Sequence, residues 1–131
     1  MAQIDNFEAF MKPPVSTERE IFVSDRFKDA KGQVQKVKIK GISSDEIQAT
    51  VKESARLGED DYQLTLRLIT KCMTYPNLKD KTLCDYYKEY EPEKVFLKIF
   101  SQPKEYMAIA NAVTKMLGIK NDKQLGAEAK N

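Results

Sequence analysis

Most of the large apolar side chains in this 131-residue sequence lie between residues 61 and 118, where they follow the spacing of amphipathic helices. Apolar residues recur three and four positions apart in this stretch, which is the pattern of helices with one buried face. Pro76 ends the first helical segment, and Pro92 and Pro103 are well placed in the first turns of later ones. The sequence therefore predicts a helical bundle that contains the core of one domain.

One more helix is predicted before this stretch. Ser43 is followed three residues later by a glutamate, which is the capping-box pattern of a helix start. Ile47, Val51 and Ala55 then form a narrow apolar stripe, which we expect to lie along the edge of the core. With this helix, residues 43–118 make a bundle of about five helices.

Residues 15–42 predict a β-hairpin, because apolar and polar residues alternate with period two on both sides of a turn. The turn falls at residues 29–32, with Gly32 in the left-handed conformation. The fold class is therefore α+β, with an N-terminal hairpin packed on a mainly α-helical bundle. The polar face of the hairpin carries four basic side chains, namely Arg26, Lys36, Lys38 and Lys40.

These basic side chains allow two interpretations. Lysines on exposed strands prevent edge-to-edge aggregation. Alternatively, the hairpin is the contact surface of a small adaptor that binds an acidic partner or nucleic acid. The chain has 22 basic and 20 acidic side chains, and this near balance weighs against a dedicated nucleic-acid-binding protein.

The two ends of the sequence read as attachments to the domain of residues 15–118. Residues 1–14 form an N-terminal arm, predicted to be mobile, in which Ile4, Phe7, Phe10 and Met11 would share one helical face before Pro13-Pro14. This arm either folds back on its own domain or docks on a neighbouring subunit, which would make a homo-oligomer. Residues 119–131 are polar, show no anchoring pattern and are predicted to be a disordered tail.

The sequence offers no catalytic, cofactor-binding or metal-binding motif. Histidine is absent, which excludes Ser-His-Asp and Cys-His catalysis and histidine-ligated metals. The acidic run at residues 59–61 is better explained as the start of a helix than as a metal site. Cys72 and Cys84 are expected to be buried free thiols. No apolar run approaches the ~18 residues of a membrane span. We therefore expect a protein that is not an enzyme and uses no cofactor.

Aromatic residues form the candidate partner-binding surface. Four of the six tyrosines lie between residues 75 and 90, and tyrosine is enriched at protein interfaces. Packing at the edge of the core is the alternative explanation of this cluster. The predicted contact residues are Tyr75, Tyr86, Tyr87, Tyr90 and Phe96.

An ordered set of sequence blocks resembles a known family. They are Phe-Val-Ser-Asp-Arg-Phe-Lys-Asp (22–29), Gly-Ile-Ser (41–43), Cys-Met-Thr-Tyr-Pro-Asn-Leu-Lys-Asp (72–80), Leu-Cys-Asp-Tyr-Tyr (83–87), Pro-Glu-Lys-Val-Phe-Leu-Lys-Ile-Phe (92–100) and Glu-Tyr-Met-Ala-Ile-Ala-Asn-Ala-Val (105–113). Together they resemble the XkdN-like tail assembly chaperones of contractile-tailed phages and prophages, over roughly residues 21–119.

The resemblance implies a function. Such a chaperone is expected to bind the tape measure protein, keep it soluble and help recruit tail tube subunits. It would act in the cytoplasm of the bacterial host and be absent from the mature virion. A long helical client of this kind would be shielded by many weak apolar contacts, to which Met73, Met107 and Met116 could contribute. Two alternatives remain, a structural head or tail completion subunit and the nucleic-acid-binding adaptor.

Overall fold

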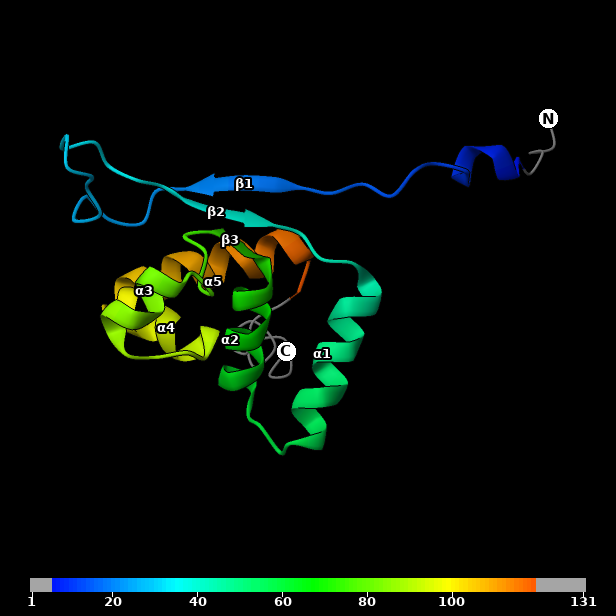
Figure 1. Cartoon of the computed structure of the whole chain (residues 1–131). Coiled ribbons are helices and arrows are strands. Elements are labelled where there is room, and N and C mark those ends of the chain that lie inside the picture. The colour runs from blue at the N-terminus through cyan, green and yellow to red at the C-terminus, as the bar shows by residue number, and fades with distance from the viewer. Residues whose placement is uncertain (1–5, 120–131) are drawn as a thin grey trace, which may run out of the picture.

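The structure is a computed structural model that describes residues 6–119 of the chain. Within this range, five α-helices lie below a three-stranded antiparallel sheet (Figure 1), which confirms the α+β prediction. The strands are β1 (Glu18–Ile21), β2 (Val37–Lys40) and β3 (Met73–Tyr75). The helices are α1 (Ser44–Arg56), α2 (Asp61–Cys72), α3 (Lys81–Tyr87), α4 (Pro92–Ile99) and α5 (Pro103–Leu117).

The predicted hairpin forms, and charged side chains of its outer face lie opposite one another across the strands. β1 and β2 place Glu18 opposite Lys40 and Glu20 opposite Lys38. Opposite charges that face each other across antiparallel strands stabilise the pairing. On the inner face of β2, Val37 and Ile39 are buried. The outer face of the hairpin is therefore mixed in charge, and two of its lysines face glutamates.

The predicted turn of the hairpin is confirmed. The backbone N–H of Gly32 donates a hydrogen bond to the carbonyl oxygen of Asp29 (2.9 Å), and Gly32 has a φ of 78°. This left-handed conformation favours glycine because a Cβ atom is disfavoured there. The Asp29 carboxylate also accepts hydrogen bonds from the N–H groups of Lys31 and Gln33, both at 2.9 Å. A side chain at the start of the turn thus holds the loop closed.

The predicted end of the central helix was wrong by three residues. We expected the helix to run to Tyr75, before Pro76, but α2 ends at Cys72 and the next three residues form β3. β3 pairs with β2, with Met73 opposite Ile39 and Tyr75 opposite Lys38. Two strands alone are marginally stable, and a third strand on the free edge of β2 satisfies that edge.

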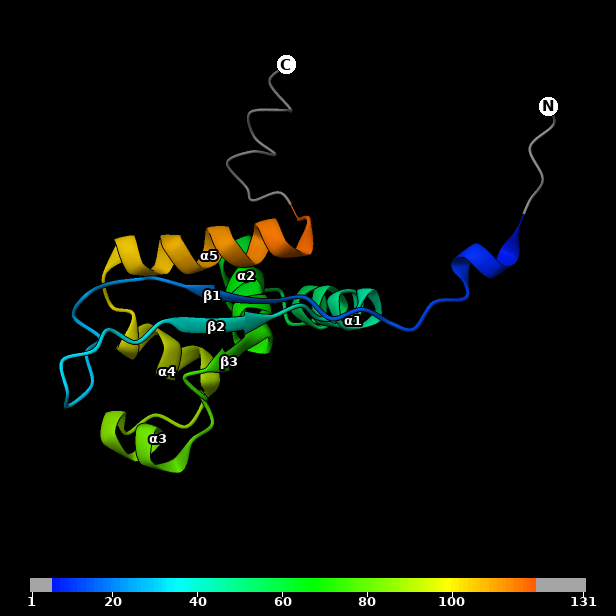
Figure 2. The ribbon, with the colours of Figure 1, turned by 90° about the horizontal axis from the view of Figure 1, so that it is seen from above.

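α2 is the centre of the bundle, with α1, α4 and α5 in contact with it. α2 begins at the acidic run, as predicted. The Asp60 carboxylate accepts a hydrogen bond from the Gln63 N–H (2.9 Å), and the Gln63 side chain accepts one from the Asp60 N–H (3.2 Å). Seen from above, α5 and α3 lie on opposite sides of the strands, with α2 below them (Figure 2). The prolines at the starts of α4 and α5 occupy the expected first-turn positions.

The face that α1 turns to the core differs from the prediction. Thr50 and Ser54 are buried and Ile47 is half-buried, whereas Val51 of the expected stripe is 42% exposed and Ala55 is also exposed. The Thr50 hydroxyl donates to the carbonyl oxygen of Glu46 (2.7 Å), so its polar atom needs no water. Small side chains on the buried face of a helix allow a neighbour to approach closely, and α1 contacts α2.

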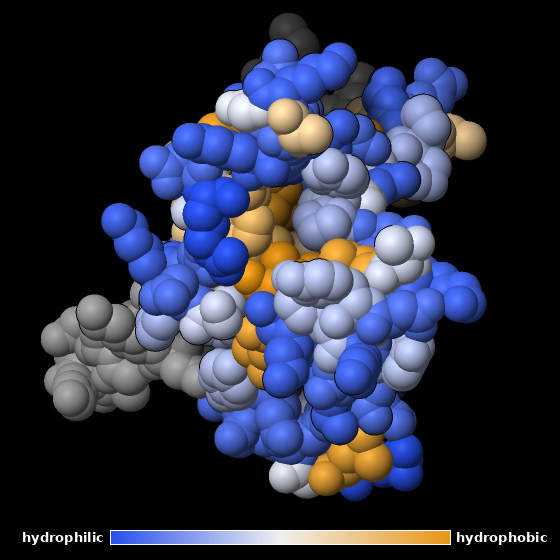
Figure 3. Space-filling view, turned by 60° about the vertical axis from the view of Figure 1, so that its left-hand side comes forward, coloured by the Kyte–Doolittle hydropathy of each residue, from blue (hydrophilic) through white to orange (hydrophobic). Residues whose placement is uncertain are grey.

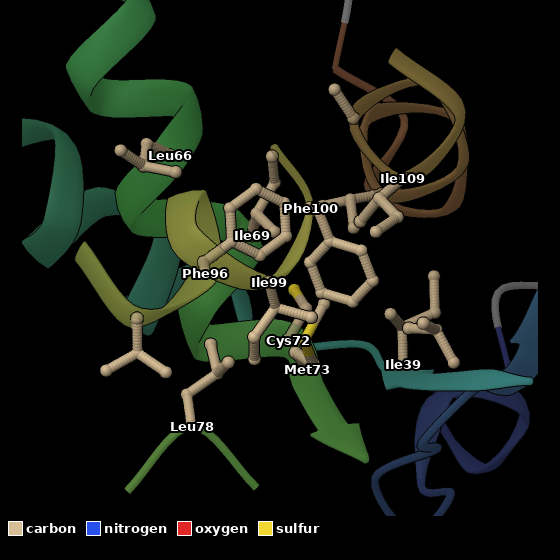
Figure 4. Close-up of a cluster of buried hydrophobic side chains, with 14 of the residues drawn as sticks. Ile39, Leu66, Ile69, Cys72, Met73, Leu78, Phe96, Ile99, Phe100 and Ile109 are labelled. Atoms are coloured by element: carbon tan, nitrogen blue, oxygen red, sulfur yellow. The ribbon is translucent and has the colours of Figure 1, made fainter. Parts of the chain in front are cut away.

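The core lies between the inner face of the sheet and α2, α4 and α5 (Figure 4). Cys72 and Cys84 are buried free thiols, as predicted. Burial raises the pKa of Cys72 to about 11, with a smaller contribution from Glu46. A thiol of this kind is protonated at neutral pH and is a poor nucleophile. The side chains with the least exposed surface are Phe96, Ile39, Ile69, Ile109, Val95, Val113 and Cys72.

The described part of the N-terminal arm stands away from the domain. Phe7–Phe10 form a short 3-10 helix, η1, beyond the outer end of β1 (Figure 1). Phe7, Phe10 and Met11 are all exposed, so the arm does not fold back on its own domain in this structure. Ile4 and almost all of the predicted tail, from residue 120 on, lie outside the described residues.

Candidate partner-binding surface

An apolar groove opens between the hairpin loop and α3. It has a cavity volume of about 260 Å³. Segments far apart in the sequence come together to form it, and we call it the groove from here on. It is lined by Phe27, Lys28, Gln35, Lys36, Val37, Tyr75, Pro76, Leu83, Tyr87, Ile99 and Phe100. Figure 3, which brings this side of the molecule forward, shows an apolar hollow between hydrophilic side chains.

The charge at the groove is positive. Its lining includes the exposed side chains of Lys28 and Lys36, and none of the described residues that line it is acidic. The floor is apolar, because Val37, Ile99 and Phe100 are buried core residues. A groove with this combination favours an apolar segment that carries acidic side chains beside its apolar face.

Tyr75 is one of the predicted contact residues that the fold places at the groove. It lies at the end of β3, and its hydroxyl donates to the side-chain oxygen of Gln35 (3.0 Å). The ammonium group of Lys38 lies 5.5 Å from the centre of its ring. These contacts tie the ring to the hairpin while part of it stays exposed.

Tyr87 is the second predicted residue in the groove, and it leads to the exposed Tyr86. The two rings meet edge to face, with 4.8 Å between their centres. Tyr86 is 77% exposed and Tyr90 is 70% exposed. The Tyr90 hydroxyl donates to the Asp85 carboxylate (2.8 Å), which raises the pKa of Tyr90 and keeps its ring close to α3. We call Tyr86 and Tyr90 the tyrosine ridge.

Lys88 turns the chain between Tyr86 and Tyr90, the two residues of the tyrosine ridge. It ends α3 with a φ of 57°, a left-handed conformation that disfavours side chains with a Cβ. We predict that Lys88→Gly raises the free energy of unfolding by about 1 kcal/mol, because glycine removes that strain. Urea denaturation measures the change. A destabilised variant would show that the lysine side chain stabilises the turn in another way.

Phe96 was wrongly placed on the partner-binding surface. Its side chain is 0% exposed and belongs to the core. Its ring lies 5.0 Å from that of Phe100, measured between centres, and 6.1 Å from that of Tyr106. Since Phe100 lines the groove, Phe96 supports the floor from beneath and cannot contact a partner without opening the core.

Met73, one of the proposed adaptable methionines, is buried as well, whereas Met107 is exposed.

Arg26 shapes one wall of the groove, a role that the sequence did not reveal. Its guanidinium donates to both carboxylate oxygens of Glu105 (2.6 and 2.9 Å) and to the carbonyl oxygen of Ile99 (2.6 Å). The guanidinium also lies 4.3 Å from the centre of the Phe27 ring. Phe27 in turn meets Phe100 edge to face, with ring centres 5.3 Å apart. The ion pair therefore holds the hairpin loop against α4 and α5.

These contacts weigh against a nucleic-acid-binding hairpin. Arg26 is engaged with Glu105, and Lys38 and Lys40 face Glu20 and Glu18 across the strands. Of the four basic side chains proposed for that function, Lys36 lies at the groove. Phosphate contacts depend on several free cations on one surface, and among the four proposed side chains one is held in an ion pair and two lie opposite carboxylates.

The described residues contain no group of three or more Cys, Asp and Glu side chains that could hold a metal ion. None of the described helices is long and apolar enough to cross a membrane. What the geometry does provide is an apolar, lysine-rimmed groove beside exposed tyrosines. Fold and surface together define a small α+β protein with a surface suited to binding another protein chain.

Comparison with known proteins identifies the family. The model of the phage XkdN-like tail assembly chaperone proteins matches residues 7–130, nearly the whole chain. The chain belongs to this family of phage tail assembly chaperones.

Two proteins from Bacillus subtilis (strain 168) are similar to this chain over most of their length. YqbN is 30% identical over 125 residues, covering 87% of this chain and 84% of YqbN. The XkdN protein of the phage-like element PBSX is 27% identical over 137 residues, covering 94% of this chain and 93% of XkdN. The crystal structure of the protein YqbN has a TM-score of 0.80 to this structure at 27% identity, and the match covers 90% of this chain and 100% of the chain in that crystal structure.

Proposed function

We propose that this tail assembly chaperone binds the tape measure protein in the groove and along the tyrosine ridge. In this role it keeps the tape measure protein soluble until tail tube subunits assemble around it. The observation that carries the proposal is the groove itself, which combines an apolar floor, two lysines and adjoining exposed tyrosines. Family membership supports a partner that is a tail protein.

The chemistry of the groove suits a helical client. A tape measure protein is expected to be a long helical chain, whose apolar stripe is uncovered before the tube forms. A helix of this kind lays its stripe into an apolar groove, with anchors at positions three and four residues apart. Lys28 and Lys36 would attract acidic residues that flank the stripe. Tyrosine side chains add contact area with little loss of conformational freedom.

The proposed action needs no bond-making step. Binding and release are enough to protect the client and then hand it to tail tube subunits in the bacterial cytoplasm. The protein would be absent from finished virions, because the tube replaces it on the tape measure protein. Mass spectrometry of purified particles tests this point. A stoichiometric amount of this chain in virions would instead support a structural completion subunit.

Co-expression with the tape measure protein of the same phage or prophage tests the binding proposal. We predict that Tyr86→Ala with Tyr90→Ala weakens the complex by roughly tenfold, since exposed aromatic anchors carry much of the energy of an interface. The soluble fraction of the tape measure protein should fall accordingly. Both side chains are exposed, so the free energy of unfolding should change little.

Leu57→Ala is the matched control, because Leu57 is an exposed apolar residue at the end of α1 and lies outside the groove. It should leave the complex intact. The proposal fails if the tape measure protein is equally soluble with and without this chain. It also fails if the control variant weakens binding as much as the tyrosine variant does.

A further inference from the structure

The described part of the N-terminal arm exposes large apolar side chains. Phe7 is 80% exposed and Phe10 is 85% exposed, and Met11 follows directly. Phe7 and Phe10 lie three residues apart in η1, and in a 3-10 helix this spacing places both side chains on the same side. The arm therefore presents a compact apolar face with nothing packed against it among the described residues.

The groove complements this face in polarity and in charge. It offers an apolar floor made by Val37, Ile99 and Phe100, with two lysines at its rim. The arm carries Glu8 between its two phenylalanines, and the sequence has another acidic residue, Asp5, and no basic residue before Lys12. The arm is apolar and acidic and the groove is apolar and basic, so their charges are complementary.

The direction of the chain points to a different molecule as the acceptor. β1 runs from Glu18 towards the hairpin loop, where the groove lies, and the arm leaves at the other end of β1 (Figures 1 and 2). To reach its own groove the arm would have to reverse and pass the whole length of β1. Pro13 and Pro14 stiffen the connection and favour an extended exit.

We propose that the arm docks in the groove of a second copy of this chain. The exchange is reciprocal, so each copy gives one arm and accepts one, as a two-fold dimer requires. The arm then occupies the groove of the free protein and must leave before a tape measure helix can bind. This last step rests on the proposed function, whereas the dimer itself does not.

Analytical ultracentrifugation of the full chain tests the exchange. The wild-type chain should dimerise at micromolar concentration, and Phe7→Ser with Phe10→Ser should raise the dimer dissociation constant by roughly 100-fold. Because both side chains are exposed, the variant should remain folded. Val51→Ser, a change at an exposed apolar residue on α1, is the matched control and should leave the dimer unchanged. A monomeric wild-type chain, or a Phe7/Phe10 variant that dimerises normally, would overturn the proposal.

A mixing experiment separates arm exchange from other dimer interfaces. One protein carries Lys28→Glu with Lys36→Glu, which should weaken binding of an arm to its groove. The other protein is the Phe7/Phe10 variant, whose arm lacks the apolar contacts. Neither variant should form its own dimer, but their mixture retains one intact arm and one intact groove and should form a mixed dimer. Absence of the mixed dimer would overturn the exchange.

The two proposals can fail separately. If the exchange occurs but neither the wild-type chain nor the Phe7/Phe10 variant binds the tape measure protein, the proposed function is wrong and the dimer is still supported. If both hold, the Phe7/Phe10 variant should bind the tape measure protein more tightly than the wild-type chain, because no arm has to be displaced. Equal affinities would show that the arm and the client do not share the groove.

Discussion

Replacing Phe96 by alanine should lower the free energy of unfolding by about 3–5 kcal/mol, the range observed for deletion of a buried aromatic ring. Phe96 is 0% exposed and contacts the rings of Phe100 and Tyr106. Its removal leaves a cavity under the floor of the groove, because close-packed neighbours relax only in part. Urea denaturation followed by circular dichroism measures the loss.

The neighbouring Leu97 provides the control. It belongs to the same helix but is an exposed residue, so Leu97→Ala should cost far less than Phe96→Ala. If Phe96→Ala cost no more stability than Leu97→Ala, Phe96 would again be a candidate contact residue. A Phe96→Ala chain that unfolds at the wild-type urea concentration, yet no longer solubilises the tape measure protein, would contradict its assignment to the core.

Glu105→Gln should lower the free energy of unfolding by about 2 kcal/mol at neutral pH, since a nearly buried carboxylate loses both of its charged hydrogen bonds to Arg26. The Glu105 side chain is 5% exposed, but that of Arg26 is 47% exposed, so water screens part of the interaction. The change also releases the wall of the groove that Arg26 supports.

Glu53→Gln is a matched control for this ion pair. Glu53 makes a similar two-fold contact with Arg56 on α1, at 2.6 and 3.0 Å, but both side chains are exposed. Exposed pairs contribute little to stability. The control should therefore unfold close to the wild-type chain. If both glutamine variants lose the same stability, burial of Glu105 is not the reason for its effect.

The effect of Glu105→Gln should also depend on pH. The hydrogen bonds from Arg26 hold the pKa of Glu105 below its ordinary value of 4.5. The ionised form therefore stabilises the fold, and this contribution is complete above 4.5 and is lost as the pH falls through the lowered pKa. Wild type and variant should differ most at neutral pH and converge in acid. A difference that persists well below the lowered pKa would point to packing and not to charge.

The helix ends show how far local sequence signals reach. Asp60, Pro92 and Pro103 begin helices where predicted, and Gly118 follows α5 with a φ of 71°. Each signal acts over one helical turn, through a hydrogen bond of the cap or the fixed geometry of a proline ring. No distant part of the chain has to be known to read them, which explains why these predictions were confirmed.

The third strand shows where such signals stop. Met73, Thr74 and Tyr75 continue the apolar period of α2 as well as they suit a strand, so the sequence did not distinguish the two. Pairing with Lys38 and Ile39 decided the outcome. These partners lie more than thirty residues earlier in the chain, and pairing over that distance leaves no local pattern.

The candidate surface also combines residues that the sequence predicted with residues that only the fold revealed. Clustered tyrosines predicted a contact region, and the fold brings Tyr75 and Tyr87 into one groove while leaving Tyr86 and Tyr90 exposed. Phe96 could not be separated from them by sequence, because aromatic residues suit a core and an interface equally. Phe27 and Arg26 were missed as parts of the groove wall, because Glu105 is 79 residues away from Arg26.

The amino-acid sequence was sufficient for the α+β class, the helix starts, the hairpin turn and the family resemblance, since each depends on neighbouring residues or on an ordered set of blocks. The tertiary structure alone decided that residues 73–75 form a strand, that Phe96 is buried and that Thr50 and Ser54 are the buried residues of α1. Burial depends on what packs against a side chain, and for these residues the packing partners come from distant parts of the chain.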